Sequence, residues 1–180
     1  MNILICGGAG NGKTALAETL AVKLSAGKRR VYIATMVPFD DEDRARIARH
    51  VASRAHLGFE TLEAPRCLSS RAKTCGDVGA FLVDSVTALL LNEIFALSDG
   101  EKASETAARC IEDLRALAQS AENTVFVTDY IFSDAERYEA FTEDFRAALG
   151  AINRALADLC DVVAECCAKT VICHKGGLAF

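Results

Sequence analysis

The chain has 180 residues and a mass of 19.2 kDa, which fits one domain with a sizeable core. Its 51% hydrophobic content and mean hydropathy of +0.19 exclude an intrinsically disordered chain. Twenty basic and twenty-five acidic residues give a net charge of −5, which argues against a general nucleic-acid binder because such a protein needs a basic footprint.

Short apolar runs alternate with longer helical patterns along the whole chain. The predicted strands are residues 2–6, 30–34, 59–63, 79–84, 124–128, 161–166 and 170–174. The predicted helices are residues 13–26, 40–55, 85–97, 101–121 and 135–159. Because strands and helices alternate, we expect an α/β fold with a mostly parallel sheet that helices cover on both faces.

A glycine-rich segment joins the first predicted strand to the first predicted helix. It reads Gly7-Gly8-Ala9-Gly10-Asn11-Gly12-Lys13-Thr14 and fits the phosphate-loop pattern G-x-x-x-x-G-K-[ST] in full. Backbone N–H groups and the helix N-terminus would bind phosphate, Lys13 would contact the β- and γ-phosphates as a catalytic group, and Thr14 would bind Mg²⁺. A glycine-rich turn without function is the alternative, but the strand–loop–helix context favours a nucleoside triphosphate site.

The phosphate loop also sharpens the prediction of the fold. We expect a P-loop NTPase-like three-layer sandwich with a mostly parallel sheet, in which residues 1–180 form a single P-loop nucleotide-binding domain. Two prolines and the lack of a Gly/Ser-rich stretch leave no candidate linker.

Asp84 ends the apolar run Phe81-Leu82-Val83. Ligands bind at the carboxyl ends of such strands, so Asp84 is expected to bind Mg²⁺ together with Thr14. The alternative is that Asp84 caps the helix that begins at Ser85.

Arg46, His50 and Arg54 recur every four residues on a predicted helix and therefore share one face. Two guanidinium groups would disfavour protonation of the imidazole between them, and a neutral imidazole is a nucleophile suited to attack the α-phosphorus of a nucleotide. The alternative is a solvated basic face, which is the usual role of such charges.

The eight cysteines are predicted to be reduced thiols. No signal peptide is recognised before the phosphate loop, and the run 78–97 is broken by polar residues, so we expect a soluble cytoplasmic protein without a membrane span. Zinc binding by Cys166, Cys167, Cys173 and His174 is the alternative, but the spacing within each ligand pair is not that of zinc sites. The cysteines are Cys6, Cys67, Cys75, Cys110, Cys160, Cys166, Cys167 and Cys173.

Short matches in order along nearly the whole chain point to one family. The matching segments are Ile3–Ala9 with the phosphate loop, Tyr32–Thr35, Asp40–Glu42, Arg46-Ile47-x-x-His50 with Arg54, Gly58–Pro65, Asp84–Thr87 with Asn92, and more weakly Val125–Thr128, Phe145-Arg146, Gly150, Asn153 and Asp161. On these residues the chain resembles the bifunctional adenosylcobinamide kinase/adenosylcobinamide-phosphate guanylyltransferase family of cobalamin biosynthesis.

The resemblance implies a function and a set of site residues. It implies phosphorylation of adenosylcobinamide and transfer of GMP to adenosylcobinamide phosphate, with GTP or ATP as substrate, Mg²⁺ as cofactor and a trimeric assembly. His50 matches the histidine that becomes a GMP adduct. The positions that match the lining of the GTP site, besides the phosphate loop, are Ala34, Thr35, Met36, Val51, Ala52, Ser53, Arg54, Glu63 and Asp84.

The chain departs from the family pattern at two places. Arg49 stands where the family usually has the first residue of a His-His pair. After Thr128 the family has a glycine-bearing loop, whereas this chain has the bulkier, acidic segment Asp129-Tyr130-Ile131-Phe132-Ser133-Asp134. Carboxylates near a triphosphate repel it unless they hold a metal or a donor, so we expect the kinase half of the activity to be weakened most.

Two other functions remain open at this point. One is a diverged P-loop kinase of another small molecule, in which His50 and its arginines only contact substrate phosphate. The other is a non-catalytic GTP-binding protein, which the altered loop after Thr128 favours.

Overall fold

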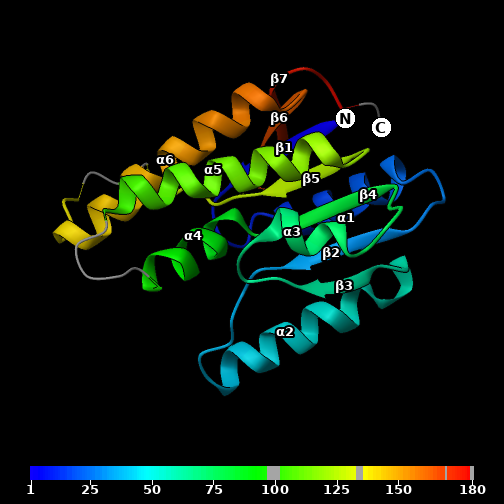
Figure 1. The fold of residues 1–180 in the computed structure, drawn as a ribbon, viewed down its shortest axis with the longest axis horizontal. Coiled ribbons are helices and arrows are strands. Elements are labelled where there is room, and N and C mark those ends of the chain that lie inside the picture. The colour runs from blue at the N-terminus through cyan, green and yellow to red at the C-terminus, as the bar shows by residue number, and fades with distance from the viewer. Residues whose placement is uncertain (97–101, 133–135, 169, 179–180) are drawn as a thin grey trace.

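In the computed structural model, residues 1–96, 102–132, 136–168 and 170–178 are described (Figure 1). They form a seven-stranded sheet in the order β3-β2-β4-β5-β1-β6-β7, in which only the last pair, β6 and β7, is antiparallel. The strands are β1 (Asn2–Gly7), β2 (Arg30–Ala34), β3 (Glu60–Glu63), β4 (Ala80–Asp84), β5 (Thr124–Val127), β6 (Val162–Cys167) and β7 (Thr170–Lys175).

Two hydrophobic clusters lie on opposite faces of the sheet, because alternate strand residues point to opposite sides. Ile3 and Ile5 of β1 pack with helix α1, whereas Leu4 of the same strand packs with helices α3 to α6. The helices are α1 (Lys13–Leu24), α2 (Asp41–Arg54), α3 (Leu68–Lys73), α4 (Val86–Phe95), α5 (Ala103–Ser120) and α6 (Ala140–Leu159). This arrangement confirms the predicted three-layer α/β sandwich with a mostly parallel sheet.

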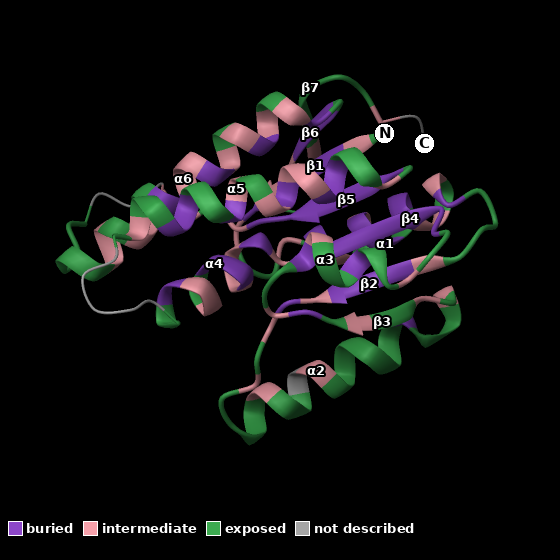
Figure 2. Cartoon of the chain, viewed as in Figure 1, coloured by how far each residue is buried: buried purple, intermediate pink, exposed green. Residues whose placement is uncertain are grey.

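Helix α2 is set apart from this packing. Figure 1 shows it at the β3 end of the sheet, and Figure 2 shows that it is mostly exposed while the central strands are buried. It begins after Asp40, whose Oδ1 accepts a hydrogen bond from the Asp43 N–H at 2.8 Å and so caps the helix. Of its described side chains, only that of Arg54 is buried.

The predicted elements are present, with shifted ends. The last long helix begins at Ala140 and not at residue 135, since residues 136–139 are irregular. The predicted ends at residues 97, 101 and 135 lie outside the described residues.

The sequence patterns did not predict α3. Its first turn is capped from α5: the Asp113 carboxylate accepts hydrogen bonds from the N–H groups of Leu68 at 2.6 Å and Ser69 at 3.0 Å. A cap from a residue 45 positions away in sequence leaves no local signal.

Among the helices that the structure describes, none has both the length and the apolar character needed to cross a lipid bilayer.

All eight cysteines are free thiols in the structure. Burial raises the pKa of the Cys110 and Cys160 thiols to about 12, so these two stay protonated and pack as small hydrophobic groups. Within the described ranges, no group of three or more His, Cys, Asp or Glu side chains is placed to hold a metal ion.

We therefore predict that the purified protein carries eight titratable thiols after denaturation and no stoichiometric zinc. Thiol titration in denaturant and elemental analysis of the native protein measure the two quantities. One tightly held zinc per chain would contradict the prediction.

Candidate nucleotide-binding site

The phosphate loop leaves β1 at the carboxyl edge of the sheet and enters α1. A Cβ atom at Gly7 would lie 2.3 Å from the Cys166 carbonyl oxygen, so only glycine fits there without a backbone shift. Gly12 caps α1 with a φ of +90°, a conformation that glycine adopts at little cost. Asn11 Oδ1 accepts a hydrogen bond from the Ala168 N–H at 3.0 Å, which ties the loop to the β6–β7 turn.

Lys13 points back over its own loop. Its side chain is 9% exposed, and its Nζ donates to the Gly8 carbonyl oxygen at 2.8 Å and forms an ion pair with Asp129 Oδ1 at 2.9 Å. The Asp129 N–H in turn donates to Thr87 Oγ1 at 3.0 Å. The acidic loop after β5 thus pairs its first carboxylate with the lysine that is expected to serve phosphate, whereas Asp134 lies outside the described residues.

Thr14 and Asp84 meet as the metal prediction requires. The Thr14 hydroxyl donates to Asp84 Oδ2 at 3.0 Å. Two neighbouring ligands of an octahedral Mg²⁺ with bonds of about 2.1 Å lie about 3.0 Å apart, so this oxygen pair fits one magnesium shell. The alternative role of Asp84 as a helix cap is filled by Ser85, whose Oγ accepts from the Ala88 N–H at 3.2 Å.

Tyr32 and Glu18, which sequence reasoning did not select, join Asp84 and Arg54 under α1. The Tyr32 hydroxyl donates to Asp84 Oδ2 at 2.6 Å, and the Arg54 guanidinium lies 3.7 Å from the centre of the Tyr32 ring. Burial and the Asp84 charge raise the pKa of Tyr32, which therefore stays a hydrogen-bond donor. Burial also raises the pKa of Glu18, although Arg54 opposes the shift.

The sequence does contain a signal that could have identified Glu18. It follows Thr14 by four residues and therefore lies on the same face of α1. Tyr32 had no such signal, since its role depends on the pairing of β2 with β4.

Ala34, Thr35 and Glu63 lie at the same edge, at the ends of β2 and β3. Ala34 is in register with both Asp84 and Glu63. The buried Thr35 hydroxyl donates to the Ser85 carbonyl oxygen at 2.8 Å and accepts from the Ser85 N–H at 2.7 Å. Thr35 therefore braces the backbone next to Asp84, while Met36 follows it and is partly buried.

The structure does not bring His50 to the phosphate loop. His50 is exposed on α2, as are Val51, Ala52 and Ser53, and its imidazole makes no hydrogen bond or ion pair with any described residue. Four strand spacings, about 19 Å, separate β3, beside which α2 lies, from β1. The Arg54 side chain points away from His50 and toward Tyr32, and its Nη2 donates to Thr61 Oγ1 at 3.2 Å. The side chain of Arg46 lies outside the described part of the structure.

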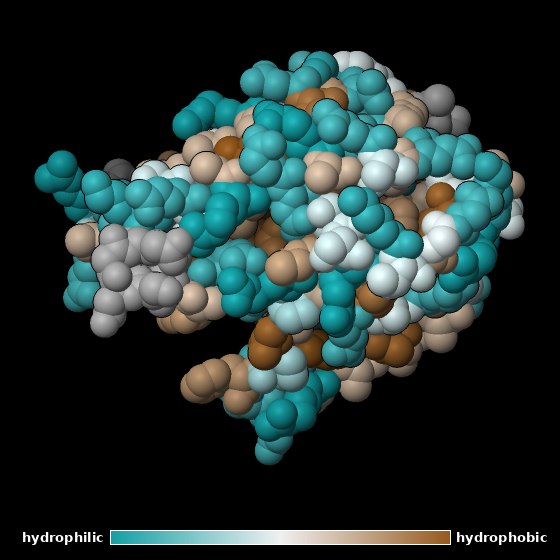
Figure 3. Space-filling view, viewed as in Figure 1, coloured by the Kyte–Doolittle hydropathy of each residue, from teal (hydrophilic) through white to brown (hydrophobic). Residues whose placement is uncertain are grey.

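Exposed hydrophobic side chains surround α2. Most of the face in Figure 3 is hydrophilic, and hydrophobic groups gather near α2. Phe39 is 93% exposed and Val37 54% exposed just before the helix, and Val51 is 44% exposed within it. Exposed hydrophobic side chains that lie close together are typical of an interaction surface.

A family model described as cobinamide kinase / cobinamide phosphate guanyltransferase matches residues 3–172. The match spans nearly the whole chain, including the phosphate loop, Asp84 and α2. No curated protein sequence matches the chain.

Solved structures with a similar fold share little sequence with the chain. One, described as an ATPase domain, is 11% identical, with a TM-score of 0.57 over 97% of this chain and 76% of that one. The flagellar accessory protein FlaH from Methanocaldococcus jannaschii is 12% identical, with a TM-score of 0.47 over 97% and 78%. The first of these supports the P-loop fold.

Replacing Lys13 should abolish nucleotide turnover while leaving the fold intact. Lys13→Ala is expected to lower turnover by about 100-fold or more, because the ammonium stabilises phosphate charge and Asp129 remains solvated after its loss. Turnover with circular dichroism as a check on folding measures this, and Lys23→Ala, later on α1, is the matched control. Unchanged turnover in Lys13→Ala would show that the loop is not the phosphate site.

Replacing Asp129 should strengthen nucleotide binding. Asp129→Asn removes both a competitor for Lys13 and a negative charge beside the triphosphate, so we expect GTP to bind roughly tenfold more tightly at low salt. Calorimetry of GTP binding checks this, with Asp158→Asn on the exposed side of α6 as control. Equal or weaker binding by Asp129→Asn would mean that the ion pair does not oppose the nucleotide.

Proposed function

The chain belongs to the cobinamide kinase / cobinamide phosphate guanyltransferase family, and we propose that it is a GTP-dependent enzyme with both activities. It phosphorylates adenosylcobinamide and transfers GMP to adenosylcobinamide phosphate through a GMP-histidine intermediate. The observation that carries the proposal is the complete phosphate loop, with the Thr14–Asp84 pair beside it, in a chain that matches the family over residues 3–172.

In the kinase half, the substrate hydroxyl oxygen attacks the γ-phosphorus and forms an O–P bond, while the bond from that phosphorus to the β–γ bridging oxygen breaks. GDP leaves with the bridging oxygen, and the hydroxyl proton passes to solvent. The backbone N–H groups of the loop and the ammonium of Lys13 hold the phosphate oxygens in line. Thr14 and Asp84 would hold Mg²⁺, which neutralises phosphate charge when bound.

In the transfer half, an imidazole nitrogen of His50 attacks the α-phosphorus and pyrophosphate leaves. A phosphate oxygen of adenosylcobinamide phosphate then attacks the phosphorus, the P–N bond breaks, and free His50 returns. Because His50 lies apart from the phosphate loop in the structure, this half requires α2 to approach a phosphate loop. The loop can belong to the same chain or to a neighbouring copy in the trimer that the family resemblance implies.

The Lys13–Asp129 ion pair supports an imbalance between the two halves. Lys13 must leave Asp129 for GTP to bind in either half, but only phosphorylation transfers the γ-phosphoryl group that Lys13 contacts, whereas guanylylation uses His50 as its nucleophile. We therefore propose that phosphorylation is the weaker activity, which separate assays of phosphorylation and guanylylation test. Comparable rates in both would contradict this part of the proposal.

Two further parts of the proposal concern the whole protein. Residues 1–180 act as one nucleotide-binding domain, and the free thiols favour a cytoplasmic location.

One observation favours a second candidate. The separation of His50 from the phosphate loop fits a diverged P-loop kinase of another small molecule, in which α2 takes no part in a covalent step.

Labelling with α-labelled GTP separates the two candidates. Wild-type protein should acquire an acid-labile, base-stable label, and His50→Ala should lose that label while keeping phosphoryl transfer, because only guanylylation needs a nucleophile. His56→Ala, in the short turn after α2, is the matched control and should label normally. A label that survives in His50→Ala would assign the nucleophile to another residue, and an unlabelled wild type would favour the diverged kinase.

A further inference from the structure

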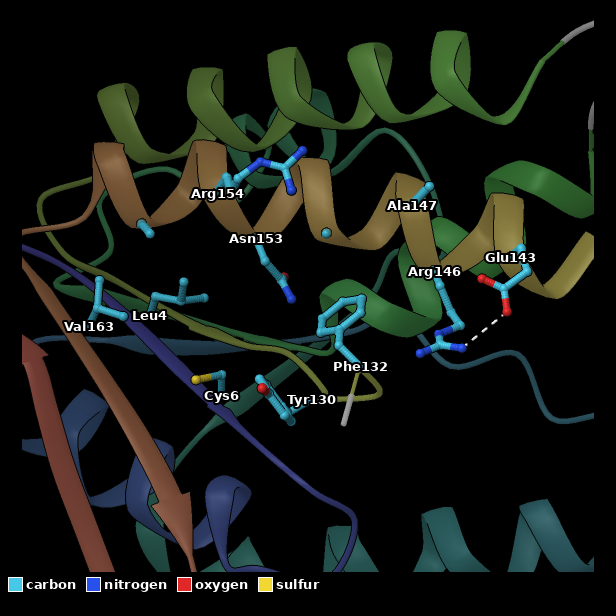
Figure 4. Close-up of a pocket in the computed structure, with 12 residues that line it drawn as sticks. Leu4, Cys6, Tyr130, Phe132, Glu143, Arg146, Ala147, Asn153, Arg154 and Val163 are labelled. Atoms are coloured by element: carbon cyan, nitrogen blue, oxygen red, sulfur yellow. Dashed lines mark hydrogen bonds and ion pairs between the residues drawn. The ribbon is translucent and has the colours of Figure 1, made fainter. Parts of the chain in front are cut away.

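A pocket of about 570 Å³ lies between α6 and the strands β1 and β6 (Figure 4). Its floor is apolar and comes from Leu4 of β1 and Val163 of β6. Ala147 and Gly150 of α6 form part of one wall. These small residues leave the space open, and its volume is in the range of small-molecule sites.

Two aromatic residues of the altered loop after β5 close one side of the pocket. The rings of Tyr130 and Phe132 meet edge to face, with centroids 5.7 Å apart. The Phe132 ring passes over the α6 backbone, since a Cβ atom at Gly150 would lie 3.7 Å from it. The bulky residues that replace the family's glycine-bearing loop therefore build an apolar surface for a ligand.

Asn153 and Arg154 of α6 offer hydrogen-bond donors that no described residue accepts. Asn153 Oδ1 accepts from the Thr128 hydroxyl at 2.8 Å, and the amide nitrogen has no partner among the described residues. Figure 4 shows this side chain pointing from α6 into the pocket. The Arg154 guanidinium also lines the pocket and makes no hydrogen bond or ion pair with the described part of the chain. The pocket thus offers an apolar surface with donors for carbonyl or other acceptor oxygens.

The pocket adjoins the phosphate loop. Cys6 lines it and directly precedes Gly7, and the Tyr130 N–H donates to the Gly7 carbonyl oxygen at 3.0 Å. Asp129, which pairs with Lys13, directly precedes Tyr130. A ligand held here would therefore have one end close to the place where the phosphates bind.

We propose that this pocket binds an edge of the corrin ring of the cobinamide substrate. A corrinoid combines an apolar ring edge with carboxamide side chains, whose carbonyl oxygens suit Asn153 and Arg154. The pocket is too small for the whole macrocycle, so the rest of the ring stays outside and the hydroxyl-bearing side chain reaches past Gly7 toward Lys13. This inference rests on the proposed function, since it takes cobinamide as the substrate.

Equilibrium dialysis with adenosylcobinamide, followed by its visible absorbance, tests the pocket directly and does not depend on either activity. Ala147→Phe, at an exposed helical position, fills the pocket and should weaken binding by about tenfold or more. Arg154→Met removes a charged donor and should weaken it by about tenfold. Ala108→Phe, at an exposed position of α5 outside the pocket, should bind as wild type does. The affinity for GTP should stay within about twofold of wild type in all three variants. Retained GTP binding also shows that each variant is folded.

The possible results separate the pocket from the proposed function. Wild-type protein that binds GTP but not adenosylcobinamide would overturn both. Wild-type binding that Ala147→Phe and Arg154→Met leave unchanged would overturn the pocket alone. Loss of GTP binding in a folded Ala147→Phe would assign the pocket to the nucleotide and overturn the proposal.

Discussion

The site depends on one carboxylate oxygen. Asp84 Oδ2 accepts hydrogen bonds from both Thr14 and Tyr32, so it joins α1, β2 and β4 at the carboxyl edge of the sheet. These two donors satisfy an oxygen of a partly buried carboxylate, which would otherwise lose its hydrogen bonds to water. The guanidinium of Arg54, the last residue of α2, in turn lies over the Tyr32 ring. The candidate magnesium site is therefore linked through Tyr32 and Arg54 to the helix that carries His50.

Most of the fold could be predicted from the sequence because the strands between the two edge strands β3 and β7 are largely buried and appear as continuous apolar runs. Residues 30–34 and 124–127 show this clearly, since every position is buried or partly buried. The short helix Leu68–Lys73 could not be predicted, because Asp113 of another helix caps it. The late start of the last long helix at Ala140 was missed because residues 136–139 include Glu and Arg, which have favourable helix propensities.

The residues of the candidate site likewise fall into those that the sequence predicted and those that it did not. Lys13, Thr14 and Asp84 were found from local patterns, since a phosphate loop and a strand-end carboxylate have sequence signals of their own. Tyr32 and the pairing of Lys13 with Asp129 depend on which strands are neighbours, which no local pattern states. The helical spacing of His50 and Arg54 predicted a shared face. A long arginine side chain can, however, reach groups that lie away from that face. The Arg54 guanidinium stacks on the Tyr32 ring and donates to Thr61 Oγ1, whereas the His50 side chain is exposed to solvent.

In the proposed function, the loop after β5 lies between the nucleotide site and the acceptor pocket. Asp129 holds the phosphate-binding lysine, and the next residue, Tyr130, both bonds to the Gly7 carbonyl oxygen and forms the rim of the pocket under α6. A nucleotide whose phosphates bind Lys13 would break the ion pair between Lys13 and Asp129. A ligand in the pocket would contact Tyr130, the residue that follows Asp129. Two ligands that contact adjacent residues of one segment are coupled when each of them changes the position of that segment. In the proposed function, the sign of this coupling depends on whether the acceptor holds Asp129 toward Lys13 or away from it.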